Sequence, residues 1–128
     1  MSEENVELLR RLIDAYNRGD YVAASERAHP DVEMIPPGDQ PPYRGVKQLR
    51  DWMKPDAFAK QRTEGREFTE VGNRVLMRQH TWITGASSGI EMDFDNWSLW
   101  SFDDDGLITR VEFFLDRQAA LEAAGLSE

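Results

Sequence analysis

Residues 90–102 read IEMDFDNWSLWSF, and two kinds of side chain alternate along this run. Side chains two positions apart on a strand share a face, so the run predicts a strand with two different faces. One set is apolar or neutral and is expected to face inward: Met92, Phe94, Asn96, Ser98, Trp100 and Phe102. The other set carries the acids and is expected to face outward: Asp93, Asp95, Trp97, Leu99 and Ser101.

Three further runs have the same character. Residues 67–71, 74–84 and 107–115 are rich in β-branched and aromatic side chains, and short turns containing Gly, Asn or Asp separate them. The expected inward sets are Met77, Gln79, Thr81 and Ile83 on the second run and Val111, Phe113 and Leu115 on the last. Strands joined by such short turns predict an antiparallel meander.

The first part of the chain is helical in pattern. Apolar residues recur every three or four positions from Val6 to Tyr16, which predicts an amphipathic helix that ends at Gly19. Asp20 is suited to cap the start of a second helix over residues 21–28. This helix is expected to end before His29, because Pro30 disfavours helical geometry in the residue before it.

The remaining segments complete the expected order of elements. Residues 31–35 predict a short strand, a third helix begins at Gly45, and residues 118–124 predict a short C-terminal helix. Helices followed by hairpin-connected strands are typical of an α+β fold, in which helices pack on one face of a curved sheet.

Composition narrows the class of protein. At 128 residues the chain is the size of one domain, expected to span 1–128. Its 15 Lys and Arg against 24 Asp and Glu give a net charge of −9, which argues against nucleic-acid or membrane partners. It has no Cys and only two His, so no metal site and no cofactor are expected. The acidic N-terminus carries no secretory signal pattern, which favours a cytoplasmic protein.

Two motif matches are better explained as hairpin turns. Ser101, Asp103, Asp105, Gly106 and Glu112 fit the spacing of a calcium loop, but strand patterns flank them where helices are required. Residues 85–89, GASSG, fit a nucleophile elbow, yet a strand pattern follows where that motif needs a helix.

Several short motifs, taken in order, resemble one family. They are YNRGD at residues 16–20, HPDVE at 29–33, YRG at 43–45, Trp100, DGLI at 105–108 and FLDRQAAL at 114–121. Together they resemble a SnoaL-like protein of the nuclear-transport-factor-like (ketosteroid isomerase-like) superfamily over nearly the whole chain. The resemblance implies a cone-shaped α+β fold, in which a strongly bent antiparallel sheet wraps around N-terminal helices and encloses a pocket.

The resemblance says less about activity, because one fold hosts many functions. The superfamily includes isomerases, cyclases, epoxide hydrolases, dehydratases and non-catalytic modules. Aligned with the steroid isomerases, this chain has Leu12, Met34 and Ser98 where those enzymes carry their tyrosine and two aspartates. Their proton shuttle therefore cannot operate here by the same route.

The inward faces predict an apolar pocket with a few neutral polar groups, suited to a small apolar ligand. The expected ligand-binding residues are Tyr16, Met34, Trp52, Gln79, Thr81, Asn96, Ser98, Trp100 and Phe113. The alternative is that the polar members only bond one another in an ordinary core.

The outward faces combine aromatic residues with opposite charges, a composition typical of interfaces. This predicts a homodimer through the outer sheet face, with Arg78, Trp82, Trp97, Arg110 and Phe114 in contact. The alternative is a set of scattered surface aromatics covered by long charged side chains.

Any catalytic reading depends on strand register. A single β-bulge reverses which side chains face inward, and it would bring His80 and Asp95 together inside the cone as an acid–base pair. A similar slip would turn Glu33 inward as a second candidate base.

Two functions remain open from the sequence. The first is a small-molecule-binding protein, in its catalytic form a cofactor-free isomerase, cyclase or hydratase acting on an apolar substrate. The second is a non-catalytic ligand-binding or dimerisation module of the same fold, in which the pocket is closed or lined only by neutral groups.

Overall fold

A computed structural model describes residues 2–38, 40–54 and 56–127 of the chain. Four helices and six strands follow one another within these residues. The helices are α1 (Ser2–Asn17), α2 (Tyr21–Ala24), α3 (Gly45–Met53) and α4 (Arg117–Ala124). The strands are β1 (Ala28–Ile35), β2 (Tyr43–Arg44), β3 (Phe58–Val71), β4 (Arg74–Gly85), β5 (Glu91–Phe102) and β6 (Ile108–Phe114). No helix in the described ranges is both long and apolar enough to cross a membrane.

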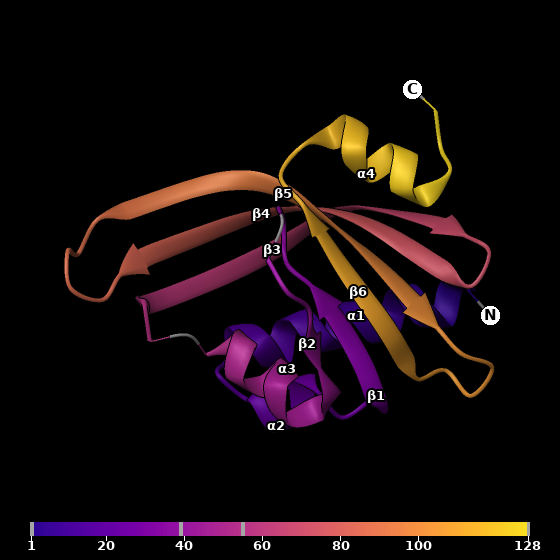
Figure 1. The fold of residues 1–128 in the computed structure, drawn as a ribbon, viewed down its shortest axis with the longest axis horizontal. Coiled ribbons are helices and arrows are strands. Elements are labelled where there is room, and N and C mark those ends of the chain that lie inside the picture. The colour runs from indigo at the N-terminus through magenta and orange to yellow at the C-terminus, as the bar shows by residue number, and fades with distance from the viewer. Residues whose placement is uncertain (1, 39, 55, 128) are drawn as a thin grey trace.

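The six strands form one bent, unclosed sheet in the order β2-β1-β6-β5-β4-β3. Strands β3 to β6 make the predicted antiparallel meander. The expectation of a wholly antiparallel sheet is wrong at one place, because β1 pairs with β6 in parallel. Helices α1, α2 and α3 lie on one side of the sheet and α4 lies on the other (Figure 1). The α+β class and the helix-wrapping sheet are therefore confirmed.

Two clusters of buried residues lie on opposite faces of the sheet. The larger joins the sheet to α1 and α3 and includes Leu9, Met34, Met77 and Trp100. The smaller lies under α4, where Ala120 and Ala124 pack on Leu76 and Leu99. Asp116 caps α4 by accepting from the Ala119 N–H, and Gly125 ends the helix with a left-handed φ of 75°. The C-terminal helix thus packs on the outer face of its own chain.

Two expected element boundaries are wrong. The strand expected at residues 67–71 begins at Phe58. Its first half is an edge strand that pairs with β4 and leaves most of its side chains in solvent, so it shows no pattern of buried residues. The helix expected over residues 21–28 ends at Ala24, and β1 begins at Ala28. The Ile108 N–H donates to the Arg27 carbonyl at 2.8 Å, so pairing with the C-terminal part of the chain replaces further helix.

Two side chains expected inside are exposed. Met92 is 54% exposed, because the end of the β4–β5 hairpin projects beyond the helices (Figure 1). Leu115 is 60% exposed, because β6 ends one residue before it. The apolar interior is therefore confined to the central part of the sheet, where α1 and α3 cover it.

Candidate functional site

Strands β4 and β5 decide which side chains face the helices. Residues 74–84 pair with residues 91–101 in unbroken register, with Gln79 opposite Asn96 and His80 opposite Asp95. Gln79 is 3% exposed and Ser98 is fully buried, as expected for inward residues. The register predicted for these two strands is therefore the one observed.

The three candidate acid–base residues lie on the outer face. His80 Nδ1 lies 2.6 Å from Asp95 Oδ1, and His80 Nε2 lies 2.6 Å from Asp93 Oδ2. Since carboxylates only accept, a doubly protonated imidazolium satisfies both contacts. Hydrogen bonds to Asp95 and then Asp93 raise the pKa of His80 above its ordinary value, and the bond from His80 lowers the pKa of Asp95.

The third candidate, Glu33, is also outside the cone. Its neighbours Val32 and Met34 are buried, so Glu33 points to the opposite face. There its carboxylate lies 2.7 Å from Arg44 Nη1 and 4.0 Å from Arg110 Nε. The bulge that would bring His80 and Asp95 inward does not occur between residues 74–84 and 91–101, and β1 does not turn Glu33 inward either.

A small cavity of about 40 Å³ lies between the sheet and the helices. Five of the expected ligand-binding residues line it: Tyr16, Trp52, Gln79, Trp100 and Phe113. Four lining residues were not anticipated: Leu12, Ile13, Met53 and Thr63. The first two share a helical face with Tyr16 and could have been inferred from spacing. Thr63 could not, because it lies in the part of β3 that the sequence pattern does not reveal.

Two aromatic rings close this cavity on one side. Trp52, on α3, and Phe113, on β6, have ring centroids 4.8 Å apart. A cavity of about 150 Å³ is known to bind benzene, so a cavity of about 40 Å³ has room for a few atoms and not for a whole ring.

A directed chain of hydrogen bonds ends at the cavity. Trp100 Nε1 donates to Ser98 Oγ at 2.7 Å, and Ser98 Oγ donates to Gln79 Oε1 at 2.6 Å. An indole N–H can only donate, so the hydroxyl proton of Ser98 is left for Gln79. A reversed amide would leave that proton without an acceptor in a fully buried site. The orientation of the Gln79 amide is therefore determined.

The amide nitrogen of Gln79 is the open end of this chain. Within the described part of the molecule, Gln79 Nε2 has no hydrogen-bond acceptor. No described side-chain nitrogen or oxygen is both fully enclosed and unpaired, so Nε2 borders open space. The space that Gln79 lines is the cavity. The Gln79 amide therefore presents an N–H donor to the cavity.

The other four expected ligand-binding residues do not line the cavity. Thr81 Oγ1 donates to Asn96 Oδ1 at 2.9 Å, and it lies 3.3 Å from Thr63 Oγ1. Ser98 orients the Gln79 amide through its hydrogen bond to Gln79 Oε1. Met34 is fully buried in the main cluster. The polar residues of this set, Thr81, Asn96 and Ser98, bond to other side chains within the core, as the alternative interpretation of the sequence expects.

Tyr16 separates the cavity from a larger open groove. Burial, and secondarily the neighbouring Tyr21, raises the pKa of the Tyr16 phenol well above its ordinary value. The Tyr16 hydroxyl therefore stays protonated at neutral pH and can donate a hydrogen bond. The groove has a volume of about 680 Å³ and runs between the end of α1 and the start of β3.

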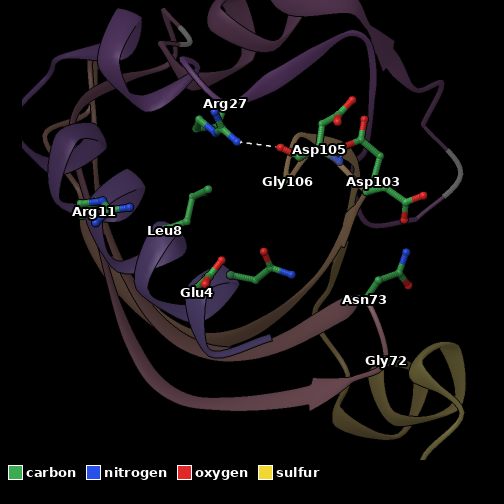
Figure 2. A pocket seen from close by; sticks show the side chains of 11 residues that line it. Glu4, Leu8, Arg11, Arg27, Gly72, Asn73, Asp103, Asp105 and Gly106 are labelled. Carbon is green, nitrogen blue, oxygen red and sulfur yellow. Dashed lines mark hydrogen bonds between the residues drawn. The ribbon is translucent and has the colours of Figure 1, made fainter. Parts of the chain in front are cut away.

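A second open groove, of about 770 Å³, is polar and lies between α1 and two hairpin turns (Figure 2). Arg27 Nη2 donates to the Asp105 carbonyl at 3.0 Å, and Asp103 Oδ1 accepts from the N–H groups of Asp105 and Leu107. Asn73 donates to the Phe102 carbonyl at 2.7 Å. These side chains stabilise the turns, so residues 103–106 form the hairpin turn predicted for them.

Part of the outer face is covered by the chain itself. Trp97 and Phe114, two of the five residues expected at a dimer interface, pack in the cluster beneath α4. Trp82 contacts His80 edge-on, with ring centroids 4.6 Å apart. The surface left for a partner is therefore smaller than the sequence suggested.

Comparison with known proteins identifies the family. The model of the SnoaL-like domain matches residues 9–111. No curated protein sequence matches the chain. An NTF2-like protein of unknown function from Burkholderia pseudomallei K96243 superposes with a TM-score of 0.78 and 21% identity, over 92% of this chain and 95% of that one.

Two further solved structures carry functional names. A protein from Jannaschia sp. CCS1, named as a SnoaL-like polyketide cyclase, has a TM-score of 0.79 and 19% identity, over 99% of this chain and 95% of that one. SalBIII is described as an epoxide hydrolase/cyclase-like enzyme in pyran ring formation in the polyether salinomycin. It has a TM-score of 0.79 and 14% identity, over 91% of this chain and 93% of that one. At these identities the likeness concerns the fold.

Proposed function

The chain belongs to the SnoaL-like domain family, and on this premise we propose that it binds a small apolar molecule through an acceptor oxygen, such as a ketone. The observation that carries the proposal is the unpaired N–H of Gln79 at the cavity. Gln79 is only 3% exposed, so its free N–H meets little solvent, and a ligand oxygen would supply the missing bond. Tyr16, kept protonated by burial, is a second donor on the cavity wall.

The two volumes suggest how such a ligand would lie. The cavity of about 40 Å³ has room for a carbonyl group, whereas the adjoining groove of about 680 Å³ has room for a ring system. Tyr16 borders both spaces. The ligand would therefore place its oxygen towards Gln79 and its apolar body in the groove.

A binding role is better supported than acid–base catalysis. Among the described residues that line the cavity, Tyr16 alone is ionisable, and its raised pKa opposes its use as a base near neutral pH. An isomerase or cyclase that removes a proton from carbon needs such a base. The names of the Jannaschia protein and SalBIII suggest cyclisation as the catalytic alternative. That reaction would need a base that is part of the substrate or that lies outside this cavity.

The test compares acetylnaphthalene with ethylnaphthalene, which differ in one carbonyl oxygen. We expect the ketone to bind about 2- to 10-fold more tightly, as one neutral hydrogen bond would give. Gln79→Leu should abolish this preference, and Gln118→Leu, the same change on exposed α4, should preserve it. Equal affinities for both compounds in the natural protein would refute the proposal.

A further inference from the structure

The groove beside Tyr16 differs in charge from the chain as a whole. It is lined by four cations, Arg18, Lys54, Lys60 and Arg62, and by one carboxylate, Asp56. The chain as a whole has 24 acidic against 15 basic residues. The negative net charge of the chain therefore does not describe the local charge of this groove.

The side chains of three of these cations have no partner among the residues that the structure describes. Several bases elsewhere form ion pairs: Arg44 with Glu33, Lys47 with Asp51, and Arg66 with Glu64. The side chains of Lys54, Lys60 and Arg62 have no ion pair or hydrogen bond to any residue in the described ranges. Arg18 is held by Asp14. An acidic protein thus leaves three positive charges unpaired in a single groove.

The same groove offers aromatic surface. Phe58 is 37% exposed, and Trp82 also lines the groove. At the end next to the cavity, Tyr21 packs edge-on against Tyr16 with ring centroids 6.0 Å apart. Flat apolar rings beside unpaired cations suit a ligand that has both an aromatic body and an anionic group.

We propose that this groove binds the anionic end of an aromatic or otherwise apolar acid. The carboxylate or sulfonate lies among Lys54, Lys60 and Arg62, and the rings lie against Phe58 and Trp82. The further step, that the far end of the same ligand places a carbonyl oxygen at Gln79, rests on the proposed function. The anion site itself does not, because it depends on a different set of residues.

The test uses two fluorescent probes that differ by one sulfonate group, anilinonaphthalene sulfonate and its neutral counterpart N-phenylnaphthylamine. We expect the sulfonate to bind more tightly to the natural protein. The double variant Lys60→Gln with Arg62→Gln should weaken sulfonate binding by about 3- to 10-fold, since exposed charge pairs contribute modestly. It should leave binding of the neutral probe unchanged.

Two controls localise the effect. Lys47→Gln removes one positive charge from an exposed position on α3 and should leave both affinities unchanged. Raising the salt concentration from about 10 mM to about 150 mM shortens the screening length from about 30 Å to about 8 Å, which should weaken the sulfonate alone. Amide NMR shifts on adding the sulfonate should concentrate at Gly19, Lys60 and Arg62.

The outcomes separate this proposal from the proposed function. If the double variant binds the sulfonate as the natural protein does, or if the sulfonate does not bind, the anion site is refuted. The ketone preference that depends on Gln79 could still hold in that case. If that preference is absent while the double variant still lowers sulfonate affinity selectively, the anion site stands and the cavity proposal fails.

Discussion

The indole N–H of Trp100 donates to the hydroxyl of Ser98 at 2.7 Å, two residues away on the same face of β5. This bond directs the Ser98 proton to Gln79 and leaves the Gln79 amide nitrogen facing the cavity. A hydroxyl with no exposed surface therefore orients an amide donor that borders the cavity.

Ser98→Ala should destabilise the protein by about 1–3 kcal/mol, because it leaves the Trp100 N–H and Gln79 Oε1 buried without partners. Urea unfolding measures the loss. Ser101→Ala, on the other face of β5, should cost much less. Equal costs for the two variants would show that the hydrogen-bond chain is not important for stability.

Asn17 holds the free edge of β3. Its Nδ2 donates to the Thr63 carbonyl at 2.7 Å, and its Oδ1 accepts from the Thr63 N–H at 2.9 Å, as a neighbouring strand would. Asn17→Ala should cost about 1–3 kcal/mol and speed hydrogen exchange at Thr63. Asn5→Ala on the same helix is the control. Unchanged exchange at Thr63 would contradict the role of Asn17.

The outer-face histidine predicts a pH dependence. Because the pKa of His80 is raised on folding, its contribution to stability is complete below its ordinary value of 6.5 and is lost as the pH rises through the raised value. The pKa of Asp95 is lowered, so its contribution is present above 3.8 and is lost as the pH falls further. The difference in Tm between the natural protein and His80→Gln should therefore shrink above neutral pH. A constant difference from pH 5.5 to 9, or an NMR titration of His80 at about 6.5, would contradict this coupling.

Trp52 and Phe113 limit the size of the cavity, so a smaller residue at position 52 should enlarge it. We expect Trp52→Leu to lower stability by about 1–3 kcal/mol and to raise the affinity for acetylnaphthalene. Trp97→Leu, which changes the same residue type on the outer face, should leave that affinity unaltered. Tighter binding in both variants would place the ligand elsewhere.

The homodimer remains a prediction, now confined to the part of the outer face that α4 leaves uncovered. Arg78 lies opposite Trp97 at the centre of the β4–β5 ladder. Light scattering after gel filtration should give twice the chain mass for the natural protein and the single-chain mass for Arg78→Glu. A monomeric natural protein would refute the homodimer. A dimeric Arg78→Glu variant would show that the dimer forms through another surface.

Local pattern was sufficient for most of the fold. Alternation along residues 74–84 and 90–102 placed Gln79 and Ser98 inward and His80 and Asp95 outward, and the unshifted β4–β5 ladder preserves that assignment. It failed at residues 58–66, where an edge strand needs no buried side chain except Thr63 and so carries no alternating signal. It also failed at residues 25–28, where a turn at residues 25–27 and the pairing of Ala28 with Ile108 of β6 replace helix.

The sequence by itself determined the α+β class, the order of the elements other than β2, and the face on which each central side chain lies, because these depend on periodicity among near neighbours. Only the tertiary structure decided that Gln79 keeps an unpaired N–H, that Trp52 and Phe113 reduce the cavity, that α4 covers Trp97, and that Lys54, Lys60 and Arg62 share a groove with Tyr16. Each of these depends on side chains that are far apart in the chain and meet only when the sheet bends around the helices.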